Sequence, residues 1–91
     1  MRWIASYDIA ADRRRARTVS ILQRWGIRTQ ESVFILEVEN EEVIEIEIGL
    51  GTILDDRTDR FAMVPICENC WSKRVTIGPV VEQPADHWWV L

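Results

Sequence analysis

The sequence predicts one α+β domain, built as a sheet that carries two helices on the same face. Three observations support this fold class. The 91 residues are enough for one domain but not for two, so we assign residues 1–91 to a single domain. Strand-like and helical hydrophobic patterns follow one another in the order β-α-β-α-β-β. Two of the strands are apolar on both sides, so a hydrophobic face stays bare after the helices cover the other.

The chain begins with a strand and a helix. Residues 3–9 alternate large and small side chains, which predicts a strand. Asp12 is a good N-cap for a helix over about residues 13–25, and Gly26 is a good stop signal. The buried stripe expected on this helix consists of Ala16, Val19, Leu22 and Trp25, and the opposite side carries Arg13, Arg17, Ser20 and Arg24.

The middle of the chain contains two segments with ambiguous patterns. Residues 28–38 include an apolar run and form either one bent strand or a tight hairpin. Residues 42–54 match a strand, because isoleucine and glutamate alternate there. They match a helix equally well, because Val43, Ile46 and Leu50 recur at helical spacing. We favour a helix, since a β-α-β pattern requires a second crossover at this point.

The last third of the chain is expected to be mostly strand. Residues 60–66 are apolar on both faces, and a turn at Glu68-Asn69 leads to a further strand near residues 74–77. Residues 87–91 are expected to form a C-terminal edge strand. Because the sheet would expose a large apolar patch, we expect a twofold homodimer to cover it.

The charge distribution indicates a nucleic-acid partner although the net charge is −4. Residues 1–30 contain seven arginines and two aspartates, whereas residues 31–59 contain ten acids and one arginine. A polyanion responds to local potential, so the basic N-terminal third is compatible with phosphate binding. A solvated arginine-rich helix face is the alternative.

The cellular location predicted from the sequence is cytoplasmic. No apolar run approaches the roughly 20 residues that cross a bilayer, so no membrane partner is expected. Charge also occurs too early in residues 1–8 for the core of a signal peptide.

Asp8, which ends the first predicted strand after Tyr7, is the best candidate metal ligand. One carboxylate is a poor site for a hard divalent cation, which prefers several oxygen ligands. A twofold dimer would supply two Asp8 groups, and Mg2+ or Mn2+ would relieve their repulsion. Such an ion could support hydrolysis of a phosphodiester. An aspartate that caps the strand-to-helix turn is the alternative.

Arg13, Arg14 and Arg15 occupy the first turn of the predicted helix. Positive side chains there oppose the helix dipole, at a cost of a few tenths of a kcal/mol each. A phosphate at the helix start would interact favourably with both the dipole and the guanidinium groups. We therefore favour phosphate contact. The alternative is that Asp12 offsets the cost and the arginines are solvated.

Cys67 and Cys70 have the CxxC spacing. A structural zinc site requires four ligands, and the chain has neither a second CxxC pair nor a histidine near this one. A redox-active pair would be expected beside a helix start, which this segment does not resemble. We expect a turn with two semi-buried thiols.

Taken together, these residues resemble the CRISPR-associated Cas2 family. The matching pieces are Tyr7-Asp8-Ile9, Arg15 and Arg17 on the helix, residues 26–34, and more weakly residues 59–61, residues 65–67 and Cys70. The resemblance implies a ferredoxin-like fold, a homodimer, and a Mg2+ or Mn2+ ion between the Asp8 groups of two subunits. It also implies that Tyr7, Arg15, Arg17, Arg28 and Phe34 surround the nuclease site.

The resemblance leaves two functions open. Family members are metal-dependent endonucleases on RNA or DNA, and they are also non-catalytic bridges in the Cas1 integrase complex that inserts spacers. A small-ligand-binding ferredoxin-like domain is a third alternative, for which the sequence shows no pocket signature. Asp8 and Tyr7 are the expected catalytic residues, with Asp8 as the metal ligand. The expected nucleic-acid contacts are Arg13, Arg14, Arg15, Arg17, Arg28 and Phe34.

Overall fold

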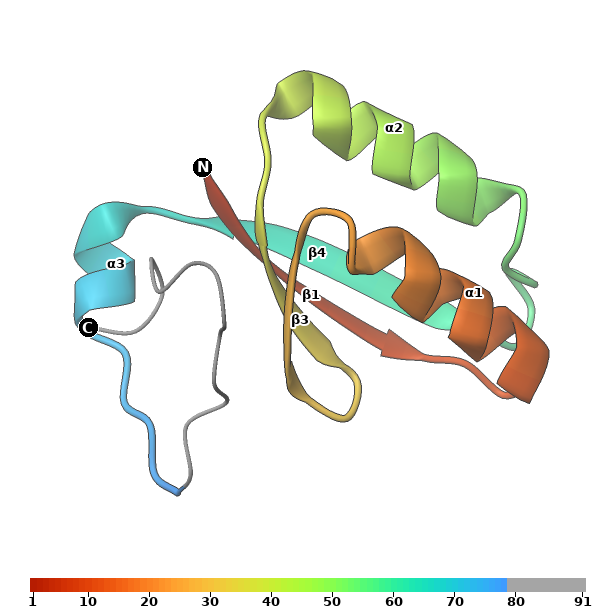
Figure 1. The fold of residues 1–91 in the computed structure, drawn as a ribbon, viewed down its shortest axis with the longest axis horizontal. Helices are drawn as coiled ribbons and strands as arrows, with labels where there is room; N and C mark the ends of the chain where they lie inside the picture. The colour runs from red at the N-terminus through yellow and green to blue at the C-terminus, as the bar shows by residue number, and fades with distance from the viewer. Residues whose placement is uncertain (79–91) are drawn as a thin grey trace.

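The computed structural model describes residues 1–78, which form one sheet and three helices (Figure 1). The elements in chain order are β1 (Arg2–Asp8), α1 (Asp12–Leu22), β2 (Gly26–Gln30), β3 (Val33–Glu37), α2 (Asn40–Gly51), β4 (Arg60–Ile66) and α3 (Glu68–Ser72). The four strands are antiparallel and lie in the order β2-β3-β1-β4. Among residues 1–78, no helix has the length and apolar character needed to span a membrane.

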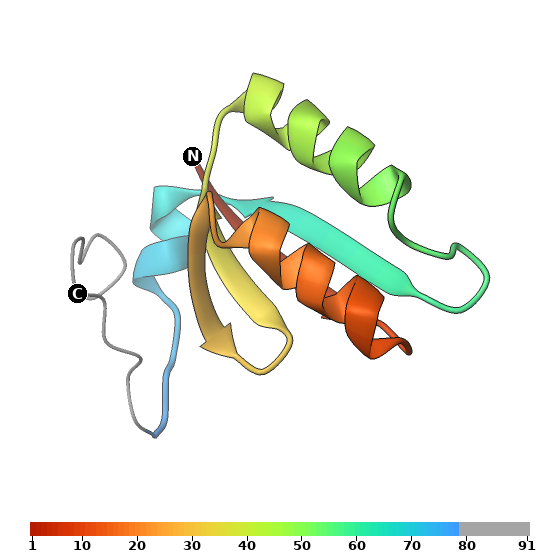
Figure 2. The ribbon, with the colours of Figure 1, turned by 45° about the vertical axis from the view of Figure 1, so that its right-hand side comes forward.

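Both α1 and α2 cover the same face of the sheet, which confirms the predicted α+β class with two helices on one face (Figure 2). The first six elements follow the β-α-β-β-α-β order of a ferredoxin-like fold. Beneath the helices lies the main core, which contains Ala5, Tyr7, Leu22, Phe34 and Leu36 among its buried residues. The inward side chains of β1 and β3 thus form the floor on which both helices pack.

The structure resolves both ambiguous segments. Residues 26–37 form a hairpin of two strands, β2 and β3, and not one bent strand. Residues 40–51 form a helix, as favoured, which begins with a capping box in which the Glu39 amide donates to the Glu42 carboxylate at 2.8 Å. Ile44 and Ile48 are 56% and 64% exposed, whereas Ile46 is buried. The alternation of isoleucine and glutamate in this segment therefore belongs to a helix, in which only some of the isoleucines are buried.

The first helix differs in detail from the prediction. It ends at Leu22 and not at residue 25, and Gly26 opens β2 instead of stopping the helix. Leu22 is buried and Val19 and Trp25 pack on the core, but Ala16 is exposed. Thr18 takes the buried position because its hydroxyl donates to the Arg14 carbonyl at 3.0 Å.

The C-terminal part of the described chain corrects two predictions. A short helix, α3, replaces the turn expected at Glu68-Asn69, and residues 74–77 form no strand. Trp71 of α3 is 2% exposed and packs with Ile27, Ile35 and Ile66 on the face opposite α1 and α2 (Figure 2). The expected bare face is therefore partly covered within the chain. The edge strand expected at residues 87–91 lies outside the described residues.

Gly26 is the position where a side chain is least tolerable. A Cβ there would clash with the backbone carbonyl of Ile35 and lie 2.7 Å from the Leu36 Cα. We expect Gly26→Ala to lower the free energy of unfolding by about 2 kcal/mol. That corresponds to roughly 8–16 °C in a thermal melt followed by circular dichroism. Gly51→Ala is the control, because nothing lies within 4 Å of its Cβ position. Equal melting temperatures for the two variants would contradict this account.

Candidate nucleic-acid interface and metal site

Asp8 lies at the end of β1, on the side of the sheet that faces away from α1 and α2. Because Ala5 and Tyr7 are buried beneath the helices, the alternation of the strand places Ser6 and Asp8 on the other side. The Asp8 side chain is exposed, and within residues 1–78 it makes no hydrogen bond or ion pair. Its neighbour across the ladder is Arg60, the first residue of β4. Asp8 is thus available to a ligand.

One chain does not complete a metal site around Asp8. Within residues 1–78 no group of three or more histidine, cysteine, aspartate or glutamate side chains could hold an ion. Mg2+ and Mn2+ prefer several oxygen ligands, so a single carboxylate with water binds them weakly. The carboxylate has the right chemistry for such an ion, but a site here requires a further carboxylate from a second copy.

Tyr7 supports the site from inside the core. Its ring is 5% exposed, and its hydroxyl donates to the Glu31 carbonyl at 3.1 Å. Arg28 donates to the same carbonyl from Nη2 at 2.8 Å, and Nη2 also lies 3.4 Å from the Tyr7 hydroxyl. These bonds hold the β2–β3 turn against the end of β1. Tyr7 therefore positions Arg28, which is itself exposed.

Phe34 does not have the place predicted for it. Its side chain has no exposed surface, and its ring lies 6.3 Å from that of Tyr7 between centroids, at a tilt of 36°. A residue buried in this way cannot contact nucleic acid. The apolar run around Phe34 predicted a strand correctly, but the run does not show which face each side chain occupies. Phe34 instead packs behind Tyr7.

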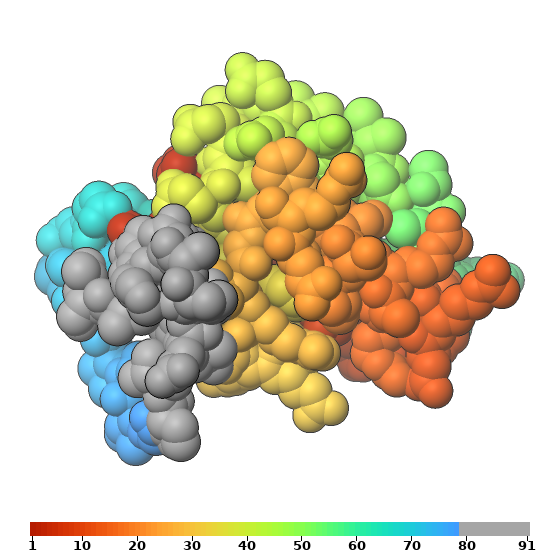
Figure 3. All heavy atoms as spheres, viewed as in Figure 1, coloured from red at the N-terminus to blue at the C-terminus, as the bar shows by residue number. Residues whose placement is uncertain are grey.

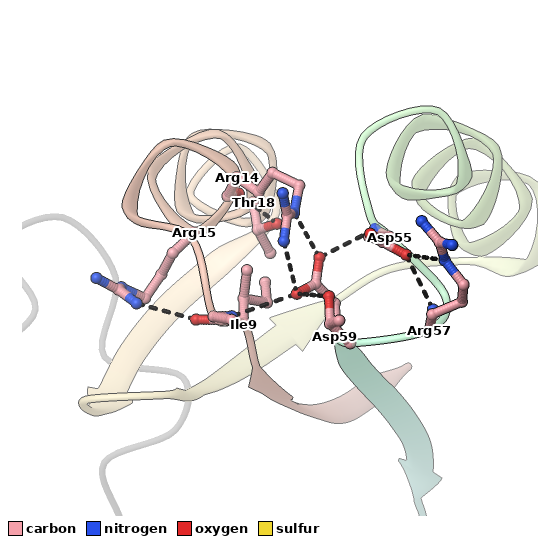
Figure 4. A network of polar contacts seen from close by, with 9 residues as sticks. Ile9, Arg14, Arg15, Thr18, Asp55, Arg57 and Asp59 are labelled. Atoms are coloured by element: carbon pink, nitrogen blue, oxygen red, sulfur yellow. Dashed lines mark hydrogen bonds and ion pairs between the residues drawn. The ribbon is translucent and has the colours of Figure 1, made fainter.

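The four arginines predicted to contact nucleic acid from α1 fall into three groups. Arg13 and Arg17 are exposed and have no hydrogen bond or ion pair within residues 1–78, and α1 forms a ridge on the molecular surface (Figure 3). Arg15 donates to the Ile9 carbonyl at 2.9 Å (Figure 4). It also donates to the Asp12 carboxylate, so it is partly engaged. Arg13 and Arg17 are therefore the most available to phosphate.

Arg14 is committed to the fold and not to a ligand. Its Nε and Nη2 donate to the Asp59 carboxylate at 2.7 and 3.2 Å (Figure 4). The Asp59 side chain is fully covered and also accepts from the backbone amides of Ala10, at 3.2 Å, and Asp55, at 3.0 Å. The guanidinium thus joins α1 to the loop before β4, and the nucleic-acid role of Arg14 stays a prediction. Sequence reasoning assigned no role to Asp59, although residues 59–61 were among the weaker matches to the family.

The same contacts hold the pKa of Asp59 well below its ordinary value of 3.8, chiefly through the Arg14 guanidinium. Because the folded pKa is lowered, this stabilisation is complete above about pH 4 and is lost as the pH falls towards the folded pKa. We expect Asp59→Asn to melt roughly 5 °C or more below the wild type near neutral pH.

Between about pH 4 and pH 2 the wild-type melting temperature should fall more steeply than that of Asp59→Asn. Asp56→Asn, at an exposed position of the same loop, is the control. Parallel pH profiles for wild type and Asp59→Asn would refute the assignment.

A groove of about 840 Å³ lies between α2, the loop that follows it and β4. Its lining includes the acids Glu47, Asp55 and Asp56 together with apolar side chains such as Leu50 and Phe61. No pattern in the sequence indicated this groove. The acidic rim disfavours a polyanion, so a nucleic-acid backbone is better placed at the Asp8 end.

Three elements carry exposed arginines at the end of the sheet where β1 finishes, and we call this group the basic end. It consists of Arg13 and Arg17 of α1, Arg28 of β2 and Arg60 of β4. Arg60 was not among the predicted contacts, although it opens a predicted strand. Only the register, which sets it opposite Asp8, indicates its place here. Of these four, only Arg60 shares the outer side of the sheet with Asp8, whereas Arg28, which pairs with the buried Phe34, lies on the helical side with α1.

Known proteins share both the sequence and the fold. Residues 1–74 match the family described as CRISPR associated protein Cas2. A CRISPR-associated endoribonuclease Cas2 of Rhodospirillum rubrum is 32% identical over 90 residues, which cover 99% of this chain and 73% of the relative. The crystal structure of Streptococcus pyogenes Cas2 superposes with a TM-score of 0.77 at 25% identity, covering 86% of this chain and 100% of that one. A chain in a partial Cas6-RT-Cas1–Cas2 complex gives a TM-score of 0.69 at 20% identity, covering 91% and 98%.

Proposed function

The chain belongs to the CRISPR-associated Cas2 family, and from this premise we propose that it is a homodimeric, metal-dependent endonuclease of the spacer-acquisition machinery. Its substrates would be phosphodiester bonds of RNA or DNA. The relative from Rhodospirillum rubrum is named an endoribonuclease, which supports the nuclease assignment. The single observation that carries the proposal is that Asp8 is exposed at the end of β1 and unpaired within residues 1–78.

Asp8 ends β1 on the outer side of the sheet, and within residues 1–78 its carboxylate makes no hydrogen bond or ion pair. Asp12 and Asp59, the acids closest to α1 and the start of β4, are engaged by Arg15 and Arg14. A twofold mate against the same face would bring a second Asp8 towards the first, and two facing carboxylates repel each other unless a cation neutralises them. Mg2+ or Mn2+ held by these two residues would supply Lewis-acid and water-activating chemistry.

The chain's own contribution to the reaction is binding and orientation. The guanidinium groups of the basic end would hold backbone phosphates of the nucleic acid, with Arg60 on the Asp8 side of the sheet and Arg28 kept in place on the helical side by the Glu31 carbonyl and Tyr7. Because the Tyr7 hydroxyl already donates to Glu31, it acts on this site through Arg28 and not through the substrate.

The activity test is cleavage of single-stranded RNA and duplex DNA of the same sequence by the wild-type protein. Cleavage of at least one of them with Mg2+ or Mn2+, abolished by EDTA and restored by added metal, supports the proposal. Equal cleavage in EDTA, or none of either substrate with metal, contradicts it.

Binding to nucleic acid should depend on salt through the arginines of α1. We expect the double variant Arg13→Ala/Arg17→Ala to reduce the slope of log K against log salt by about 1.8 for duplex DNA, which is two phosphate contacts. Fluorescence anisotropy at several salt concentrations measures this slope. Arg57→Ala, an exposed arginine in the loop before β4, should leave the slope unchanged. An unchanged slope in the double variant would remove α1 from the interface.

A second function uses the same surface without cleavage. In an architectural subunit that bridges Cas1 integrase dimers, the basic end would hold duplex DNA and Asp8 would be dispensable. The fold shared with a chain of a Cas1–Cas2 complex and the unengaged Arg13 and Arg17 favour this candidate. Spacer integration in the presence of the Cas1 partner should then survive Asp8→Asn but fail in Arg13→Ala/Arg17→Ala.

A further inference from the structure

The cysteine pair lies where β4 passes into α3, in a setting that differs from the predicted turn. Cys67 directly precedes the helix, and Cys70 lies in its first turn, where the Trp71 amide donates to the Cys67 carbonyl at 2.9 Å. Both cysteines are free and exposed, so the thiols are not semi-buried. A helix does begin at this pair, which is the setting expected of a redox-active pair.

The two thiols influence each other's pKa in opposite directions. The backbone amide of Cys70 also faces the Cys67 sulfur and favours its thiolate, so the pKa of Cys67 is lowered. The neighbouring Cys67 sulfur raises the pKa of Cys70. Cys67 is thus the better attacking group, and Cys70 is the thiol that stays protonated beside it.

The short helix that carries Cys70 is anchored on both sides of the pair. Trp71 is buried among Ile27, Ile35 and Ile66 on the sheet, and Glu68 forms an ion pair with Arg2. Because these anchors hold the turn in place, the second attack takes place within one short segment of the chain and meets little entropic cost. Residues three apart on a helical turn also have Cα separations within the range that a disulfide spans.

We propose that Cys67 and Cys70 form a reversible intramolecular disulfide by exchange with a low-molecular-weight disulfide such as oxidised glutathione. The Cys67 thiolate attacks one sulfur of the oxidant, and the S–S bond breaks to release one glutathione thiolate. The Cys70 thiol loses its proton and attacks the Cys67 sulfur of the mixed disulfide, releasing the second glutathione. The cysteine pair is oxidised by two electrons, and one oxidised glutathione is reduced to two glutathione molecules.

The test equilibrates the full chain in glutathione buffers of increasing oxidised fraction, followed by acid quenching and mass spectrometry. Trypsin leaves both cysteines on the peptide of residues 61–73, so the disulfide appears as the loss of two hydrogens from that peptide. We expect this form to accumulate without a lasting glutathione adduct and to revert with dithiothreitol. A stable adduct on the wild type, disulfides between chains, or thiols that stay unreacted would each overturn the proposal.

The single variants separate the roles of the two thiols. Cys70→Ser retains the backbone amide at Cys67 and should accumulate a glutathione adduct on Cys67. Cys67→Ser should form its adduct on Cys70 several-fold more slowly at neutral pH, because the backbone amide that favours the Cys67 thiolate acts at Cys67. Circular dichroism checks that both variants fold. Equal adduct rates in the two folded variants would contradict the assignment of Cys67 as the attacking residue.

Discussion

Asp8→Asn is expected to lower metal-dependent cleavage by about 100-fold or more, since altering even the partners of metal ligands costs 10–100-fold. The amide keeps the size of the side chain but removes the negative charge that attracts the cation. Asp8 is exposed and unpaired within residues 1–78, so the substitution should leave folding intact. Initial cleavage rates at several Mg2+ concentrations measure the effect.

The matched control for Asp8→Asn is Glu45→Gln. It makes the same carboxylate-to-amide change at an exposed position of α2, on the helical side of the sheet. Its cleavage rate should equal that of the wild type. If Asp8→Asn cleaved at the wild-type rate while Glu45→Gln did so too, the metal assignment would be wrong and the architectural function would be favoured.

Val64→Asp is expected to weaken the homodimer by about 100-fold or more, which corresponds to roughly 2.7 kcal/mol. Val64 is 55% exposed on β4 and pairs with Ile4 of β1. Ile4 and Asp8 are four residues apart on the same strand, so Val64 and Asp8 share the outer side of the sheet. A twofold interface through this face would bring two added carboxylates into an apolar contact, where like charges cost several kcal/mol. Sedimentation equilibrium measures the dissociation constant.

Ile48→Asp is the matched control, because Ile48 is 64% exposed on α2, on the opposite side of the sheet. It should leave the dimer intact. A dimer lost in Ile48→Asp and kept in Val64→Asp would place the interface on the helices and separate the two Asp8 residues.

The sequence predicted the frame of the site well, because that frame follows from local patterns. The alternation of residues 3–9 placed Asp8 at a strand end, and the helical spacing of Ile46 and Leu50 gave α2 its buried side. The sequence did not decide between one bent strand and a hairpin, because residues 28–38 have no strong two-residue turn signal such as Asn-Gly.

The roles of individual side chains were harder to predict, since they depend on partners far along the chain. Arg14 is bound by Asp59, 45 residues away, and no local pattern distinguishes it from Arg13. Phe34 was placed at the nucleic acid by resemblance, whereas the register of β3 against β1 buries it beside Tyr7. The helix that follows Cys67 is only five residues long, too short for a periodic signal.

The most direct test of the account is the stoichiometry of Mn2+ binding, measured by electron paramagnetic resonance on wild-type protein and Asp8→Asn. If the carboxylates of two copies share one ion, the wild type binds one Mn2+ for every two chains and Asp8→Asn binds none at the same concentration. One Mn2+ per chain, or binding that is unchanged in Asp8→Asn, would contradict the shared site.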